Sequence, residues 1–517
     1  MADSPAAQSA SLPQISLAST IDIDNPPMGV FSNDWYVLML KGQKSGHMRS
    51  TMERVQRDGQ DDVICSSVSM VIEIGRAGSQ IRITMDQTTE ETIAGEPIRF
   101  ESRTALGKIP SSVVGEIKDG KVTVKTTQFG LTTKQTHKLP DGAIMSWGTY
   151  REQMKHGLHV GLKYELPLYD PTTDMKAIIP TTFEVFEPEP IDLFGRAVTA
   201  YRTQQTMRLK GLFGRETKLE STAWVTDASA VVKMHMNVPG LDIPFEVIAT
   251  TRAVALAPNE PTELMVDTLI QIDRPLDRNS QSISYRLINK NRDGIHLPET
   301  SMQKGIKAQD GTAILEVTRL SARREANGNS DHKATVDGKV GEPEDLSLYL
   351  QATPELNIDD PLIQELAKKA ADGEKNPAKL ADKLCQFVYD YIENRDLSVG
   401  FATASEVARS RQGDCTEFSV LLAALGRANK IPSRLVTGVM YADKFAGKKN
   451  VFVGHMWTQL WIDGQWVDVD AAHNQTDVDP THIAFAFYAA ETNSLAELAT
   501  SGWMSLSKTK LEIVDVK

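Results

Sequence analysis

The sequence has few cysteines, no long apolar run and no excess of basic residues, and each absence excludes a class of protein. Its 517 residues include three cysteines, Cys65, Cys385 and Cys415. Three are too few for a disulfide framework or a four-thiolate zinc site. No apolar run approaches the roughly 18 residues of a membrane-spanning helix, so we expect no transmembrane segment. The 56 basic and 68 acidic residues give a net charge of −12, which argues against nucleic-acid binding because such surfaces are basic.

The remaining composition is that of a globular protein with several domains. Hydrophobic residues make up 41% and charged residues 24% of the chain, which excludes disorder throughout. The first 27 residues are rich in Ala, Ser and Pro and lack a cationic stretch followed by an apolar run. We therefore expect residues 1–30 to be a disordered leader and see no signal peptide.

Residues 31–255 are predicted to form an antiparallel β domain, as a large curved sheet, a sandwich or an open barrel. Short runs of alternating polarity flank turn residues at several points, which is typical of hairpins. The Asp119-Gly120 pair is the strongest such signal. The predicted hairpins lie at residues 71–85, 116–124 and 223–234.

The pattern changes in the second half of the chain. Residues 256–350 indicate a smaller β-rich domain and linker, with strands at 264–272 and 313–320 and a polar loop at 326–341. From residue 355 onwards the sequence pattern is typical of helices. Asp360-Pro361 and Asn376-Pro377 are each typical of a helix start, and a third short helix is expected at 404–411.

Cys415 is expected in the first turn of a buried helix. Asp414 and Glu417 form a D-x-x-E capping pattern around it. Apolar side chains then follow at helical spacing, at Phe418, Leu421, Leu422 and Leu425. The positive end of a helix and its unpaired amides favour a thiolate, which is the nucleophile in covalent catalysis. Cys415 is therefore the candidate nucleophile.

His455 and Asp470 are expected close together on neighbouring strands. Residues 451–461 are predicted to form one strand, Asp463-Gly464 a turn, and residues 465–470 the returning strand. This hairpin brings His455 and Asp470 roughly opposite one another. Because a carboxylate can orient an imidazole as a general base, Cys415, His455 and Asp470 form a candidate catalytic triad.

Three segments carry a resemblance to a known family: GDCTEFSVLLAALGRANKIPSRLVTGVMY, GHMWTQLWIDGQWVDVDAAHNQ and DPTHIAF. Together they resemble the transglutaminase-like (papain-related) superfamily in its bacterial branch. The family pattern is a Cys at the head of a helix, an Ile-Pro-x-Arg strand entry, a His before an aromatic residue, and an Asp about 15 residues later. Those positions here are Cys415, Ile431 to Arg434, His455 and Asp470.

The strand patterns and the resemblance together predict a multidomain protein: a large antiparallel β-sheet N-terminal region, a smaller β-rich middle segment, and, as the resemblance implies, a C-terminal α+β transglutaminase-like (papain-like) domain at 355–517. The resemblance also implies a cysteine enzyme that attacks amide carbonyls of a protein or peptide substrate through a thioester. Hydrolysis is favoured over cross-linking because bulk water competes unless a cleft excludes it. A location in the bacterial cell envelope follows by analogy. The alternative is a non-catalytic binding or scaffold protein whose β domains bind the ligand or partner.

Several assignments around the triad stay open. Asp468 has the same strand parity as Asp470 and is the alternative carboxylate. His473 and His482 are either structural histidines or further bases or ligands. The candidates for a second oxyanion donor are Gln386, Asn394 and Gln412. No metal or other cofactor is expected, since neither an EF-hand loop nor a zinc motif is complete.

Overall fold

The computed structural model describes residues 21–517 other than 58, 60, 78, 108, 129–130, 211–215, 228, 239–242, 260, 290–296, 308–311, 322–344, 396, 398–401 and 489–508. Residues 1–20 of the predicted leader and the predicted loop at 326–341 lie outside this description. The chain forms two compact units. The first comprises residues up to Thr262 except two short segments, Gly75–Ile81 and Leu106–Ile109, which belong with Glu263–Lys517 in the second.

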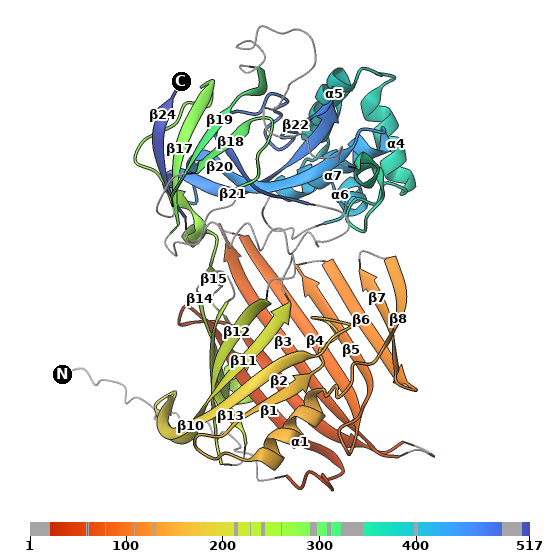
Figure 1. The fold of residues 1–517 in the computed structure, drawn as a ribbon, viewed down its shortest axis with the longest axis vertical. Helices are drawn as coiled ribbons and strands as arrows, with labels where there is room; N and C mark the ends of the chain where they lie inside the picture. Colours follow the sequence, from red (N-terminus) through yellow and green to blue (C-terminus); the bar gives the residue numbers. More distant parts are fainter. Residues whose placement is uncertain are drawn as a thin grey trace, which may run out of the picture. The chain divides into compact units, whose positions relative to one another are not determined.

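The first unit is built around one large antiparallel sheet (Figure 1). Its hydrogen-bonded order is β8-β7-β6-β5-β4-β3-β2-β1-β14-β13-β12-β11-β10-β9, with the short β15 (Thr262–Glu263) added beside β3. The strands are β1 Gly29–Leu40, β2 Gln43–Val55, β3 Val63–Arg76, β4 Ser79–Thr92, β5 Pro97–Leu106, β6 Ile109–Lys118, β7 Lys121–Gln128, β8 Leu131–Lys138, β9 Lys163–Leu168, β10 Ile179–Leu193, β11 Arg196–Lys210, β12 Glu216–Val225, β13 Val231–Val238 and β14 Ile243–Thr250.

The three predicted hairpins are confirmed as β3–β4, β6–β7 and β12–β13. The turn between β6 and β7 has positive φ angles at both Asp119 (50°) and Gly120 (68°). Two left-handed residues match the twist of the flanking strands, which is why Asp-Gly marks this turn.

Helix α1 (Ser146–His156) is attached to the large sheet through Glu91. The Glu91 carboxylate accepts the backbone N–H groups of Trp147 (2.7 Å) and Gly148 (2.9 Å), which satisfies donors that the N-cap residue leaves free. Trp147, in the first turn of the helix, is fully buried. A second short helix, α2 (Arg252–Ala255), follows β14.

The second unit contains two smaller sheets that share a core. One has the order β16-β21-β20-β23 with β22 beside β21, and the other has the order β18-β19-β17-β24. Tyr285 of the second sheet packs with Tyr441 and Phe452 of the first. The strands are β16 Ile270–Gln271, β17 Ser282–Asn289, β18 Gln303–Lys307, β19 Thr312–Thr318, β20 Ser433–Phe445, β21 Lys448–Ile462, β22 Gln465–Val469, β23 His482–Phe487 and β24 Thr509–Val516.

One strand prediction in this unit is wrong. Residues 264–272 do not form a single strand, because the 3₁₀ helix η2 (Val266–Thr268) interrupts them before β16. The carboxylate of Glu263 accepts the N–H groups of Met265 (2.9 Å) and Val266 (3.3 Å) and so favours a turn. The strand predicted at 313–320 is confirmed as β19.

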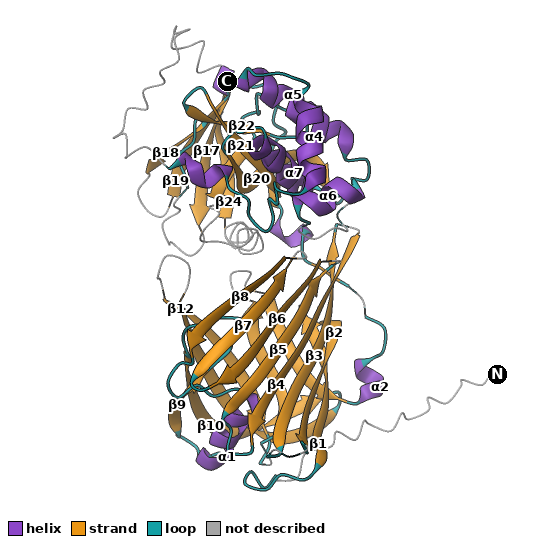
Figure 2. Ribbon diagram, turned by 90° about the vertical axis from the view of Figure 1, so that its right-hand side faces the viewer, coloured by secondary structure: helices purple, strands orange, loops and turns teal. Residues whose placement is uncertain are grey.

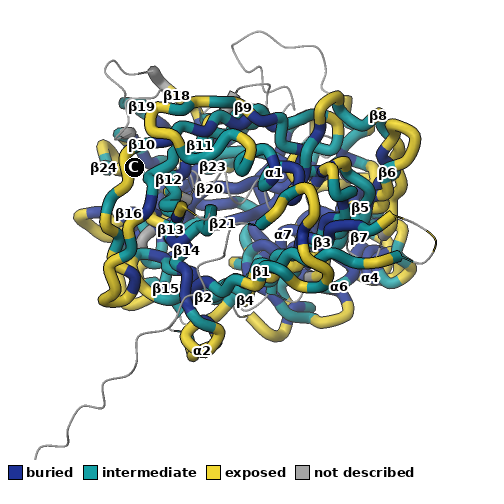
Figure 3. Tube along the Cα trace, turned by 90° about the horizontal axis from the view of Figure 1, so that it is seen from below, coloured by how far each residue is buried: buried dark blue, intermediate teal, exposed yellow. Residues whose placement is uncertain are grey.

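Helices gather in this second unit (Figure 2). Besides η2, they include η3 Leu346–Leu350, α4 Pro361–Ala371, α5 Pro377–Tyr391, α6 Ala404–Ser410 and α7 Cys415–Ala428. Asp360 and Asn376 cap α4 and α5 as predicted. α7 contacts α4, α5, α6, β20 and β21, and most of its residues are buried (Figure 3).

This architecture confirms the predicted fold class, since the chain is mostly β-sheet with its helices in the C-terminal region. The separate domain limits at 31–255, 256–350 and 355–517 stay predictions. Among the described residues, no helix combines the length and the apolarity that crossing a membrane requires.

Candidate active site

Cys415 is the first residue of α7, as the capping pattern predicts. The Asp414 carboxylate accepts the N–H of Thr416 (2.9 Å), and the Glu417 carboxylate accepts the N–H of Asp414 (2.9 Å). These reciprocal bonds complete the capping box and fix where the helix begins. Asp414 also forms an ion pair with Arg76 (2.9 Å), a residue of the same compact unit.

Gly413 is required for this entry into α7. A Cβ at position 413 would lie 2.2 Å from the Cβ of Glu417, so any side chain would push the capping carboxylate away. Gly413 and Asp414 therefore both help to position Cys415 at the start of α7.

The nucleophile helix is tied to the strand that carries His455. The Ser419 hydroxyl donates to the carbonyl of Cys415 (2.7 Å), and the Thr458 hydroxyl of β21 donates to the carbonyl of Ser419 (3.0 Å). A backbone hydrogen bond from Met456 reaches the Cys415 thiol. Because Met456 follows His455 directly, the thiol lies beside the strand segment that presents the imidazole.

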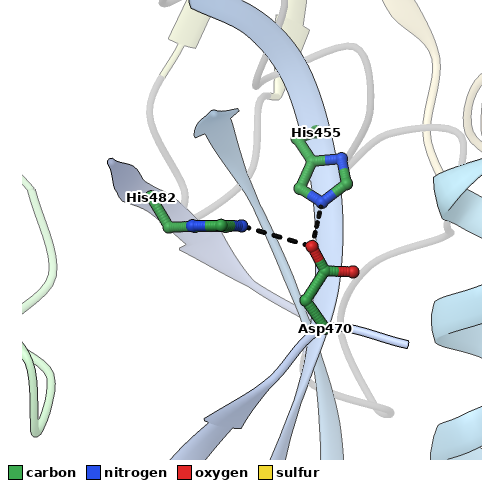
Figure 4. A group of neighbouring side chains, drawn as sticks. All are labelled: His455, Asp470 and His482. Atoms are coloured by element: carbon green, nitrogen blue, oxygen red, sulfur yellow. Dashed lines mark hydrogen bonds and ion pairs between the residues drawn. The ribbon is translucent and has the colours of Figure 1, made fainter. Parts of the chain in front are cut away.

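His455 and Asp470 form the pair that the sequence predicts (Figure 4). Their Nε2 and Oδ2 atoms are 2.9 Å apart, and both side chains are buried. Asp470 follows β22, which pairs with β21 in the register Thr458↔Val469, so the two residues share a face. The second carboxylate oxygen of Asp470 accepts the N–H of Ala472 (2.9 Å), which orients the group.

Asp468, the alternative carboxylate, has other partners. Its Oδ1 accepts the indole N–H of Trp457 (2.7 Å) and the amide of Gln459 (2.9 Å). Burial raises the pKa of Asp468, and these two hydrogen bonds lower it by less. The geometry therefore selects Asp470 as the partner of His455.

Two further histidines converge on the same oxygen of Asp470. The Nδ1 atom of His473 is 2.9 Å and the Nε2 atom of His482 is 3.2 Å from Oδ2. His473 is partly exposed, whereas His482 is buried. The other ring nitrogen of His482 faces Asp479, whose place in the site the sequence analysis missed.

The charges in this cluster alternate. Burial raises the pKa of Asp470, but the charge of His455 and the hydrogen bonds from the histidines outweigh it and hold that pKa well below the usual range. Burial, together with smaller contributions from His482 and His473, outweighs the opposing effect of Asp470 and lowers the pKa of His455, so this imidazole is neutral at neutral pH. For His482, the hydrogen bonds and charges of Asp470 and Asp479 overcome burial and raise the pKa to about 9.

The thiol of Cys415 differs from the sequence expectation. Burial and the charge of Asp414 raise its pKa well above the ordinary value, and Arg76 and the Met456 amide only partly oppose them. The expected preference for a thiolate is therefore wrong for the resting site. The capping carboxylates already accept N–H groups at the start of the helix, so fewer free N–H donors remain to stabilise a thiolate.

Cys385 of α5 lies against the backbone of the loop that carries Asp470. Its sulfur is 3.8 Å from the carbonyl oxygen of Asp470 and 3.8 Å from the side-chain oxygen of Asn474. Burial raises the pKa of this thiol to about 12, so it is an inert structural group. Its contact with Asp470 joins residues 85 positions apart, and no local motif signals it.

Arg434 and Gln386 have structural roles in this arrangement. The Arg434 guanidinium lies between the rings of Trp466 (4.2 Å) and Phe487 (3.8 Å) and donates to Gln459 (2.8 Å). The Gln386 side chain bonds Asp390 and Asn474, which removes one candidate for the oxyanion donor.

The donor atoms of His455, Asp470 and His482 all lie within 4.8 Å of one another, a spacing that a metal ion could share. The separations of 2.9 and 3.2 Å from the Asp470 oxygen are, however, those of direct hydrogen bonds. Alternating charges already compensate each buried group. We therefore describe the group as a hydrogen-bonded cluster.

Comparison with known proteins agrees with this geometry. Residues 364–471 match the family model of the transglutaminase-like superfamily, whose members are typically cysteine-based enzymes. No curated protein matches the chain.

Two solved structures illustrate how distant the structural neighbours are. A β-barrel-like protein with a domain of unknown function from Brucella abortus is 14% identical, with 43% of this chain and 96% of that chain covered and a TM-score of 0.30. The periplasmic domain of TgpA from Pseudomonas aeruginosa, bound to ethylmercury, is 15% identical, with coverages of 40% and 89% and a TM-score of 0.26. Both likenesses are too distant to argue from. On the family match, residues 364–471 form a transglutaminase-like domain within this multidomain chain.

Proposed function

We propose that the protein is a cysteine enzyme that cleaves peptide or isopeptide amide bonds through a thioester on Cys415. The observation that carries the proposal is the buried His455–Asp470 pair beside the start of α7, where Cys415 is the first residue. Asp470 engages Nε2 of His455, which leaves Nδ1 as the ring atom that can exchange a proton with the thiol.

The charge states suit His455 as the base. A neutral imidazole accepts the thiol proton, and the sulfur attacks the amide carbonyl carbon. The carbon–nitrogen bond then breaks, and His455 returns the proton to the leaving amine. The imidazolium formed in between is stabilised by the anionic Asp470.

Water completes the cycle in the hydrolytic version. His455 takes a proton from water as the water oxygen attacks the thioester carbon, the carbon–sulfur bond breaks to release the acid, and His455 returns the proton to the Cys415 sulfur. We propose hydrolysis over transfer to a second amine because bulk water competes with any amine unless a cleft excludes it.

The test is to incubate the full chain with a peptide library in water enriched in ¹⁸O and analyse the products by mass. Hydrolysis places one ¹⁸O atom in each new carboxyl group, whereas transfer to an amine creates an isopeptide bond without the label. We expect labelled products that disappear in Cys415→Ser and persist in the matched variant Cys65→Ser. Products that persist in Cys415→Ser would refute the assignment of the nucleophile.

A further inference from the structure

His482 links the Asp470 carboxylate to a second carboxylate. Its Nε2 atom is 3.2 Å from Asp470 Oδ2. Its Nδ1 atom is 3.2 Å from the backbone carbonyl and 3.4 Å from the Oδ1 atom of Asp479. The side chain is 2% exposed, so both contacts are shielded from water.

Asp479 is itself rigidly held. Its carboxylate accepts the N–H (2.9 Å) and the hydroxyl (2.5 Å) of Thr481 and the amide of Gln475 (3.0 Å). The backbone of Gln475 in turn pairs with that of Asp470 through two bonds of 2.8 Å. The loop between β22 and β23 thus closes on itself and fixes both carboxylates around His482.

The sheet places His482 on the same side of the site as His455. β20 lies between β21 and β23, and its residues Gly438 and Met440 pair with His455 and His482 respectively. The two rings lie 5.6 Å apart at 63° (Figure 4). A Cβ on Gly438 would meet the Ile483 carbonyl oxygen at 1.9 Å, so the glycine allows β23 to approach this closely.

We propose that His482 is a positioning residue of this site: clamped between Asp470 and Asp479, it holds the Asp470 carboxylate against His455 and, beside the larger effect of burial, favours the neutral imidazole that accepts a proton. The inference rests on the proposed function, because it assigns His455 as the base.

The charges around His482 support this role. The titratable groups near it are Asp470 and Asp479 in the loop, His455 on β21 and Asp468 on β22, and His473 shares the Asp470 carboxylate with it. Its charge opposes protonation of His455, and the two nearest carboxylates keep that charge in place. A neutral packing residue would supply neither effect.

The experiment follows deuterium exchange at the imidazole C2 position against pH, which reports the titration midpoint of each histidine. Cleavage before aspartate places His455, His473 and His482 on different peptides. In the wild type we expect His482 to titrate near 9 and His455 below its ordinary value. His482→Gln keeps an amide donor but loses the charge, and should raise the His455 midpoint by about one pH unit.

A second variant tests the clamp without altering either histidine. Asp479→Asn should lower the midpoint of His482 by about one unit or more, because one of its two carboxylates is gone. The matched control is His473→Gln, which removes another partner of Asp470 that is partly exposed. Its effect on His455 should be smaller, because water screens the charge.

The inference is overturned by an unchanged His455 midpoint in folded His482→Gln, by a wild-type His482 midpoint near 6.5, or by a larger shift in His473→Gln. Failure of the proposed function looks different. In that case, replacing His455 would leave the rate of Cys415 alkylation unchanged, while the titration midpoints of the histidines would remain as described.

Discussion

The charge on His482 predicts that the second unit loses stability as the pH rises. The folded pKa is about 9, against an ordinary value of 6.5, so the two states differ by 9 − 6.5 = 2.5 units. The stabilisation is fully present below pH 6.5, where His482 is protonated in both states. It falls between pH 6.5 and 9, because only the unfolded chain releases the proton there, and the loss is complete above pH 9. At 1.36 kcal/mol per unit the loss is about 3 kcal/mol.

The assay is calorimetric unfolding of wild type and His482→Gln at pH values between 6 and 10. A loss of about 3 kcal/mol corresponds to a fall in Tm of roughly 6–12 °C for a unit of this size. The difference in unfolding free energy between the two proteins should therefore shrink by about 3 kcal/mol between pH 6.5 and 9. Parallel stability curves for the two proteins would refute the reasoning, because they would show that His482 does not carry the charge.

Three further predictions concern the framework of the site. Gly438→Ala should destabilise the unit by about 1–3 kcal/mol, measured by the denaturant midpoint, because its Cβ would clash with the Ile483 carbonyl on β23; an unchanged midpoint would contradict that close approach. Thr458→Val should cost about 1 kcal/mol in the same measurement, because it removes the bond from β21 to α7, and no cost would argue against that link. Asp414→Asn keeps the helix cap but removes a charge that raises the pKa of Cys415, so alkylation of Cys415 should begin at lower pH; a shift to higher pH would be the contrary result.

Local signals in the sequence predict the parts of the site that depend on local structure. The capping pattern at Asp414 and Glu417 locates the start of α7, because side chain and backbone meet within four residues. The Asp463-Gly464 turn sets the β21–β22 register and so brings His455 to Asp470. Its left-handed residues, Asp463 at 51° and Gly464 at 82°, are those that such a turn requires.

Features that depend on long-range packing are not predictable in this way. The contact of Cys385 with Asp470 depends on how α5 lies against the loop after β22. The clamp of His482 depends on the pairing of β23 with β20 rather than on any motif. The raised pKa of Cys415 follows from burial, which a helix-terminus argument does not include.

A matched pair of variants tests which of the two buried carboxylates orients His455. Asp470→Asn removes the anion that orients His455, whereas Asp468→Asn alters a group bonded to Trp457 and Gln459. Alkylation of Cys415 near neutral pH should be slowed by about tenfold or more in the first variant and little in the second. Equal effects in the two variants would contradict the assignment of Asp470.

The most direct test of the central claim is the rate of Cys415 alkylation by iodoacetamide as a function of pH, mapped by peptide mass, in wild type and His455→Ala. The protein surroundings raise the pKa of this thiol, so reactivity near neutral pH requires His455 to accept the proton. We predict that Cys415 reacts well below about pH 8.5 and faster than the partly exposed Cys65 in wild type, and that His455→Ala abolishes the difference. Reaction of Cys415 no faster than Cys65, or unaffected by His455→Ala, would contradict the account.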